Sequence, residues 1–288
     1  MTSEQAGESV LIGYGEAMDR LRADPAYADL IRDIYLGPDT VEEARRFERS
    51  AEWRETRRLI GQDRITGARV IDLGAGAGIS SYAFAVAGAR EILAVEPWTG
   101  SSAGRDAIAR LKQPAIVTVD ARGEDMPFDT GSIDIVYARQ TLHHADDLSQ
   151  MMAESARVLR PGGVLFTCRD HVVDDDAQLA VFLAGHPVHR LAGGEHAYRL
   201  DEYLGAIRAA GLRVKKVFGP WDSIINAFPH VRSEEERQRV FRKRYVKRWG
   251  TAGRFIARIP GATLLVQRRI ARRRDPGRAY TFMAVKDR

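Results

Sequence analysis

Residues 70–78 read Val-Ile-Asp-Leu-Gly-Ala-Gly-Ala-Gly, in which Asp72 lies just ahead of three glycines at two-residue spacing. Residues 69–73 predict a short buried strand, and residues 79–87 predict the helix that follows it. The glycines therefore form a strand-to-helix turn, where they permit a sharp bend and the close approach of a ligand. Together with Asp72, this turn indicates a site for a nucleotide-like ligand that carries a positive charge.

The glycine spacing excludes a dinucleotide site of the G-x-G-x-x-G type, because the third glycine would fall at position 79, which is Ile. A pyrophosphate beside Asp72 would also be repelled at low dielectric. S-Adenosylmethionine carries an amino group that this carboxylate attracts and a ribose with two free hydroxyls. Glu96 ends the next predicted strand, residues 91–96, at the distance after Gly76 where an acidic ribose ligand is expected.

The middle of the chain continues to alternate between strands and helices. Short apolar runs predict strands over residues 114–120, 132–138 and 163–168. Residues 146–159 carry apolar side chains at helical spacing. This alternation is typical of a doubly wound parallel sheet, which binds ligands at the carboxyl ends of its strands.

Four motifs in the expected order carry a resemblance to a known family. Besides residues 70–78, they are Ala-Val-Glu-Pro at 94–97, Gly-Glu-Asp-Met-Pro-Phe-Asp-Thr-Gly-Ser-Ile-Asp-Ile-Val at 123–136, and Glu-Ser-Ala-Arg-Val-Leu-Arg-Pro-Gly-Gly at 154–163. Over residues 68–170 the chain resembles the class I S-adenosylmethionine-dependent methyltransferases related to the ubiquinone and menaquinone C-methyltransferases. The resemblance implies an α/β, Rossmann-like, doubly wound sheet of seven mostly parallel strands. Its last two strands, an antiparallel pair, are expected at 212–218 and 279–285.

The resemblance also implies which residues bind the methyl donor, S-adenosyl-L-methionine. The glycine turn holds the methionine part, the acid after the second strand holds the ribose, and the loop before Met-Pro-Phe holds the adenine. Where many relatives carry Asp two residues before the Glu of this loop, the chain has Arg122. The cofactor-binding residues implied are Asp72, Gly74, Gly76, Glu96, Gly123, Glu124, Asp125 and Gln140.

The candidate catalytic residues are His143, His144 and His196. The first two follow the fourth predicted strand, where donor and acceptor should meet, and a His pair is common there in the resembling family. A role in shaping the donor site and a role as general base remain open for them. His196 precedes a predicted helix at 200–210 in the segment that usually binds the acceptor. Some methyltransferases orient a diol with a divalent metal, but the histidine spacing matches no structural zinc pattern, so no metal is assigned.

The domain organisation follows from these elements. Residues 1–66 form an N-terminal helical cap, with helical segments at 14–35, broken at Pro25, and at 40–60. Residues 67–220 and 279–288 form the S-adenosylmethionine-binding methyltransferase domain. Residues 221–278 form a basic helical insertion before the last strand.

Charge is concentrated in this insertion. The whole chain has a net charge of +5, yet residues 232–278 hold sixteen Lys and Arg against four Asp and Glu. Such a mixture of basic and apolar residues suits an anionic membrane surface. RNA could use the same charges, and a solvated basic face that packs on the catalytic domain is the third alternative.

The function predicted is methyl transfer from S-adenosylmethionine to a small-molecule, glycan or lipid-linked acceptor. The alternatives are an RNA methyltransferase that uses the basic insertion and a non-catalytic S-adenosylmethionine-binding regulator. No Asn-Pro-Pro-Tyr motif or Pro-Cys turn supports RNA. The lone Cys168, the lack of a long apolar stretch and the lack of a signal peptide predict a cytoplasmic protein, with peripheral contact at the inner face of the membrane through 232–278.

Overall fold

The computed structural model describes residues 11–256, 258–259, 261–271 and 273–288, so the first ten residues of the expected cap lie outside it. The chain folds around one sheet with the strand order β3-β2-β1-β4-β5-β8-β7, and the short β6 pairs with the end of β5. Strands β1 to β5 pair in parallel, whereas β8 runs antiparallel to β5 and β7. The predicted fold and its antiparallel last pair are confirmed. The strands are β1 Arg69–Leu73, β2 Glu91–Val95, β3 Ile116–Val119, β4 Ile133–Arg139, β5 Leu159–Val173, β6 Tyr198–Arg199, β7 Leu212–Phe218 and β8 Arg278–Lys286.

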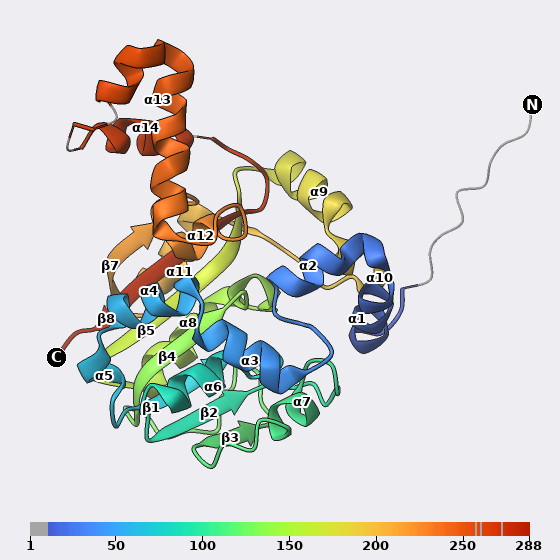
Figure 1. The fold of residues 1–288 in the computed structure, drawn as a ribbon. Helices are drawn as coiled ribbons and strands as arrows, with labels where there is room; N and C mark the ends of the chain where they lie inside the picture. The colour runs from blue at the N-terminus through green and yellow to red at the C-terminus, as the bar shows by residue number, and fades with distance from the viewer. Residues whose placement is uncertain (1–10, 257, 260, 272) are drawn as a thin grey trace, which may run out of the picture.

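Helices cover both faces of the sheet (Figure 1). On one face, aromatic rings pack edge to face from the helices down to the strands: the ring centroid of Trp53 lies 4.8 Å from that of Phe84, which lies 5.1 Å from that of Tyr137 on β4. On the other face, Met152 and Ile207 pack against the strands. The helices on the first face are α3 Thr40–Glu48, α4 Ala51–Ile60, α5 Gln62–Ile65, α6 Ile79–Val86 and α7 Arg105–Ala109. The helices on the opposite face are α8 Leu148–Val158 and α11 Leu200–Ala209.

The cap breaks where its sequence disfavours helix. The predicted break at Pro25 is present, between α1 (Tyr14–Ala23) and the short helical turns η1 (Pro25–Tyr27) and α2 (Ala28–Asp33). The continuous segment expected over residues 40–60 is wrong, because it divides into α3 and α4. Ser50 causes the division, since its hydroxyl accepts a hydrogen bond from the Trp53 amide at 3.0 Å and caps the start of α4.

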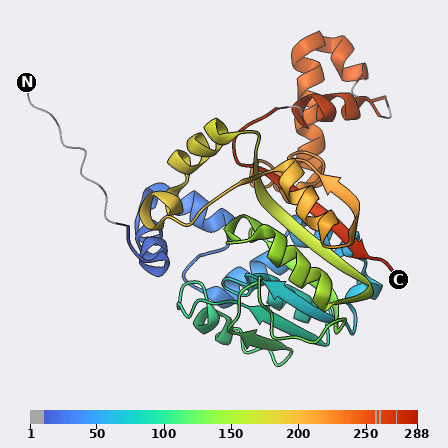
Figure 2. The same cartoon turned by 180° about the vertical axis from the view of Figure 1, so that it is seen from behind.

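Two short helices, α9 (Asp176–Gly185) and α10 (Pro187–Ala192), follow β5. β5 extends beyond the predicted 163–168 at both ends, and Asp175 caps the start of α9. Helix α10 packs against α1 through a small apolar cluster that includes Met18, Leu21 and Val188. Figures 1 and 2 show α1, α2, α9 and α10 grouped at one end of the sheet.

The basic insertion begins with α12 (Ile224–Ala227), which is buried against the sheet domain. Beyond it, α13 (Glu234–Ile256) and α14 (Ala262–Ala271) project away from the domain as an arm (Figure 1). Helix α13 is kinked at Gly250. Among the described residues, no helix is long and apolar enough to cross a membrane.

Candidate functional site

The glycine turn joins β1 to α6. Gly74, Gly76 and Gly78 all have positive φ angles, of 63°, 55° and 74°, which residues with a side chain rarely adopt. A Cβ atom on Gly74 would lie 2.5 Å from the Thr141 side chain, whereas a Cβ atom on Gly76 would meet nothing within 4 Å. The turn therefore packs tightly on the loop after β4 and leaves open space beside Gly76.

Asp72 lies beneath this turn and is 2 % exposed. Its carboxylate accepts a hydrogen bond from the Ser81 hydroxyl of α6 at 2.6 Å. Burial raises the pKa of Asp72 to about 7, although the hydrogen bonds from Ser81 oppose this shift. A buried carboxylate of this kind is stabilised by a cation that binds next to it.

Glu96 follows the end of β2, and both of its carboxylate oxygens are held by backbone amides. The Gly76 amide donates to one oxygen at 2.7 Å, and the Trp98 amide donates to the other at 3.0 Å. Burial raises the pKa of Glu96, and these two hydrogen bonds partly offset the rise. The acid after β2 is thus tied directly to the glycine turn.

The third group of predicted cofactor residues forms the loop before α8. Gly123 is buried against Met151 and Leu73. The carboxylate of Glu124 accepts hydrogen bonds from the backbone amides of Asp146 and Asp147, at 2.9 and 3.4 Å, and Asp125 is exposed. In this loop the Glu124 side chain thus organises the start of α8.

Gln140, the last of the predicted cofactor residues, has a positive φ of 53° directly after β4. Its side-chain carbonyl accepts a hydrogen bond from the Arg139 guanidinium at 2.9 Å, and its backbone N–H donates to the Cys168 carbonyl at 2.9 Å. Left-handed backbone at a non-glycine residue is strained and is concentrated at functional sites. The left-handed conformation of Gln140 changes the direction of the chain just before the histidine pair.

His143 and His144 lie on a single turn of 3-10 helix, η2 (Leu142–His144). His143 is 2 % exposed, and its Nδ1 lies 3.2 Å from the Asp170 carboxylate of β5. Asp170 also accepts hydrogen bonds from the amides of Thr141 and Leu142, at 3.2 and 2.9 Å. Asp170 therefore orients the ring of His143, with Nε2 pointing away from the sheet.

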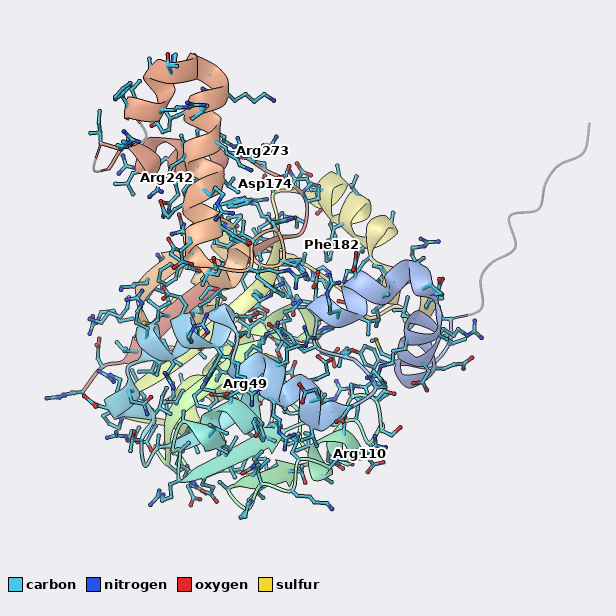
Figure 3. The ribbon with its side chains drawn as sticks, in the orientation of Figure 1. Arg49, Arg110, Asp174, Phe182, Arg242 and Arg273 are labelled. Carbon is cyan, nitrogen blue, oxygen red and sulfur yellow. The ribbon has the colours of Figure 1, made fainter. Side chains whose placement is uncertain are left out.

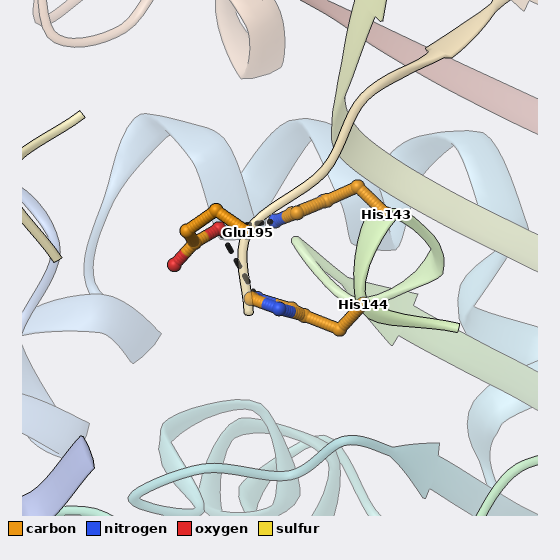
Figure 4. A group of neighbouring side chains, drawn as sticks. All are labelled: His143, His144 and Glu195. Carbon is orange, nitrogen blue, oxygen red and sulfur yellow. Dashed lines mark ion pairs between the residues drawn. The ribbon is translucent and has the colours of Figure 1, made fainter. Parts of the chain in front are cut away.

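Glu195, in the loop after α10, faces both histidines (Figure 4). Its Oε2 atom lies 3.6 Å from Nε2 of His143 and 3.7 Å from Nε2 of His144, and its Oε1 lies 3.7 Å from Nδ1 of His186. Burial raises the pKa of Glu195 and lowers those of His143, His144 and His186. The charge of Glu96 opposes the shift of His144, which links this cluster to the donor side of the site.

Glu195 was not predicted from the sequence, whereas its neighbour His196 was predicted to be a catalytic residue. The His196 ring packs on Tyr198, with centroids 4.5 Å apart, and the Tyr198 hydroxyl donates to the Ala145 carbonyl at 2.9 Å. The segment that carries Glu195 is thus attached to the loop of the histidine pair. The only sequence signal for Glu195 was its place beside His196.

The cap contributes Tyr14 to this region. Burial, and to a smaller extent the charges of Glu195 and Glu96, raise the pKa of Tyr14. Its ring lies 6.1 Å from that of Trp98. Phe47 and Trp53, the other cap aromatics, are buried in the core. The start of α1 therefore packs beside Trp98, two residues after Glu96.

A buried charge network that the sequence did not indicate supports the other side of the site. The Glu52 carboxylate accepts two hydrogen bonds from the Arg139 guanidinium, at 2.7 and 3.2 Å. The Arg169 guanidinium lies 3.9 Å from the same carboxylate and donates to the carbonyls of Ile225 and Phe228. This network joins the cap helix α4 to the carboxyl ends of β4 and β5.

Comparison with known proteins agrees with this architecture. The family described as methyltransferase domain matches residues 71–167. The ubiquinone biosynthesis O-methyltransferase of Pseudomonas aeruginosa is 32% identical over 169 residues, which cover 54% of this chain and 68% of that protein. The chain belongs to the S-adenosylmethionine-dependent methyltransferases.

Other methyltransferases are similar as well. The 27-O-demethylrifamycin SV methyltransferase of Amycolatopsis mediterranei is 31% identical over 169 residues, which cover 55% of this chain and 59% of that protein. The structure of an S-adenosylmethionine-dependent methyltransferase from Mesorhizobium loti has a TM-score of 0.53 at 16% identity and covers 83% of this chain and 99% of that one. The latter likeness shows the shared fold.

The cofactor of this methyltransferase is S-adenosylmethionine. The residues around the glycine turn fit it in charge and in shape. A buried carboxylate at Asp72 matches a ligand with an ammonium group, and the space beside Gly76 leaves room for it. Glu96 offers carboxylate oxygens at the end of the neighbouring strand, the usual place of a ribose ligand in doubly wound folds.

Proposed function

We propose that this methyltransferase transfers the methyl group of S-adenosylmethionine to a hydroxyl oxygen of a small-molecule acceptor, which binds against His143, His144 and Glu195. The observation that carries the proposal is the convergence of these three side chains beside Glu96. The names of two relatives, the ubiquinone biosynthesis O-methyltransferase and the 27-O-demethylrifamycin SV methyltransferase, both refer to oxygen, which supports oxygen as the accepting atom.

The donor is assigned to the residues of the glycine turn and its neighbours. Asp72 binds the amino group, the backbone at Gly74 and Gly76 binds the carboxylate, and Glu96 accepts hydrogen bonds from the ribose hydroxyls. The loop of Gly123, Glu124 and Asp125 lies along the adenine, and Gln140 lies near the methyl group. The burial of Asp72 and the amide hydrogen bonds that fix Glu96 support these roles.

Methyl transfer from a sulfonium is an in-line displacement. The acceptor oxygen forms a bond to the methyl carbon while the carbon–sulfur bond breaks, and its electron pair stays on sulfur. The acceptor hydroxyl loses its proton to water at the place where it binds against His143, His144 and Glu195. Positioning and the exclusion of water supply most of the acceleration.

We propose further that the arm of α13 and α14 binds an anionic membrane surface and that the acceptor is lipid-linked. The arm exposes many cations, two of which, Arg242 and Arg273, are labelled in Figure 3. Between them, Trp249, Phe255 and Ile259 are 46%, 69% and 58% exposed. Large apolar side chains among cations match the headgroup region of an anionic bilayer.

Labelled methyl transfer into fractions of a cell lysate tests the function. The expected result is that label from S-adenosylmethionine enters extractable lipid or small molecules, and that His144→Ala lowers this incorporation. Label in RNA alone would overturn the acceptor assignment. Donor binding without incorporation into any fraction would instead favour the regulator alternative.

A further inference from the structure

We infer that His143, His144 and Glu195 form a binding site for a divalent metal ion such as Zn²⁺, and that this ion binds the acceptor oxygen. The metal site itself stands on its geometry, whereas the role of the ion toward the acceptor rests on the function proposed above. No metal was predicted from the sequence, because the histidine spacing matches no structural zinc pattern.

The spacing of the three side chains fits ligands around one ion. One ligand atom from each residue lies within 4.8 Å of the others, and Glu195 Oε2 lies 3.6 and 3.7 Å from the two Nε2 atoms. These separations are too long for hydrogen bonds. Ligands at about 2.1 Å from a tetrahedral ion are separated by roughly 3.4 Å, so small side-chain adjustments bring all three into coordination.

The Glu195 oxygen between the two imidazoles needs a partner. Its side chain is 5 % exposed, and Oε2 has no hydrogen-bond partner among the described residues. Leaving a buried carboxylate oxygen unpaired is costly. A divalent ion at this point would satisfy the oxygen and use the lone pairs of both imidazoles.

Asp170 supplies the second arrangement expected of a metal site. A histidine that binds a metal through one ring nitrogen almost always donates its other N–H to a carboxylate or carbonyl. His143 Nδ1 lies 3.2 Å from the Asp170 carboxylate, so Nε2 is free to bind on the side of Glu195. Asp170 is in turn held by two backbone amides, which fixes the direction of the ring.

The ligand types select the metal. Two imidazoles and one carboxylate suit Zn²⁺, Fe²⁺, Mn²⁺ or Co²⁺, whereas Mg²⁺ and Ca²⁺ prefer oxygen ligands. Three protein ligands leave coordination positions for an acceptor hydroxyl or for two neighbouring oxygens of a diol. The hydroxyl proton passes to water when the oxygen binds the ion, and the bound oxygen then attacks the methyl carbon.

Co²⁺ titration of the whole protein, freed of metal by dialysis against a chelator, tests the inference. Visible absorption and calorimetry should both show one bound Co²⁺ per chain, displaced by Zn²⁺ and not by Mg²⁺. Glu195→Gln and His144→Ala should each weaken Co²⁺ binding more than tenfold, while His230→Gln, at an exposed histidine outside the cluster, should leave it unchanged.

Binding of S-adenosylmethionine, measured on the same samples, separates the outcomes. Retained donor binding shows that the variants are folded, so unchanged Co²⁺ affinity in both Glu195→Gln and His144→Ala would overturn the metal site. In the unsubstituted protein, Co²⁺ binding without any binding of S-adenosylmethionine would count against the donor assignments and would leave the metal site standing. Co²⁺ binding at the cluster without any effect of chelation on methyl transfer would refute the role of the ion toward the acceptor.

Discussion

Replacing Asp72 with Asn should stabilise the free protein and weaken donor binding at the same time. Burial raises the pKa of this carboxyl group from 3.8 to about 7, so keeping it ionised costs about 4 kcal/mol above pH 7. Asn keeps the acceptor for the Ser81 hydroxyl but adds a buried amide donor, which costs about 1–3 kcal/mol. The free energy of unfolding at pH 8 should therefore rise by about 1–3 kcal/mol.

The pH dependence gives this prediction its sign. Below pH 3.8 the carboxyl group is protonated in the folded and unfolded protein, so the cost of ionisation is absent. It grows as the pH rises from 3.8 and is complete above pH 7. The gain from Asp72→Asn should thus be largest at pH 8 and should turn into a loss of about 1–3 kcal/mol toward pH 4, where only the cost of the buried amide donor remains.

Urea denaturation at several pH values, with and without S-adenosylmethionine, and calorimetry measure both effects. Donor affinity should fall more than tenfold in Asp72→Asn, because the charge that attracts the amino group is gone. Ser81→Ala is the matched control, since it removes the hydrogen bond and keeps the charge, and its donor affinity should fall less. Equal donor affinity in Asp72→Asn, or a stability change independent of pH, would refute the reasoning.

Three further predictions address other parts of the molecule. Glu96→Gln should weaken the binding of S-adenosylmethionine. A donor analogue without ribose hydroxyls should bind the variant and the native enzyme with equal affinity in calorimetry. A large remaining difference between their affinities for the analogue would contradict the role of Glu96 at the ribose. Glu52→Gln should lower the free energy of unfolding by about 3–5 kcal/mol in urea, because it leaves two buried guanidinium groups without a counter-charge; a loss below about 1 kcal/mol would count against this network. Reversing Arg242, Lys243 and Arg244 to Glu should lower the affinity for anionic vesicles, measured by sedimentation, at least about a hundredfold, since removing the three cations alone loses about 3 kcal/mol and the added carboxylates are repelled. The control reverses three exposed arginines elsewhere, Arg45, Arg49 and Arg110. The same loss of vesicle affinity in this control would show that the arm is not the contact.

The arrangement of the glycine turn, Asp72 and Glu96 could be predicted because it depends on local backbone geometry. Glycines at fixed spacing permit the positive φ angles of the turn, and Asp72 and Glu96 end two neighbouring strands of a parallel sheet. Sequence order therefore places these groups together without any knowledge of long-range packing. The break at Ser50 was missed because the apolar spacing continues across it, while the hydrogen bond from the Trp53 amide to Ser50 starts a new helix there.

The acceptor half could not be predicted, because its side chains come from segments that only tertiary packing brings together. Glu195 reaches the histidine pair because α10 packs on α1 and because Tyr198 is bonded to the loop after His144. No periodicity or spacing encodes that closure. Relatives can therefore share the donor turn while the segment from β5 to α11, together with α1, differs in the side chains it presents. If this division is correct, exchanging residues 170–198 and α1 between relatives should transfer acceptor preference and leave donor affinity unchanged.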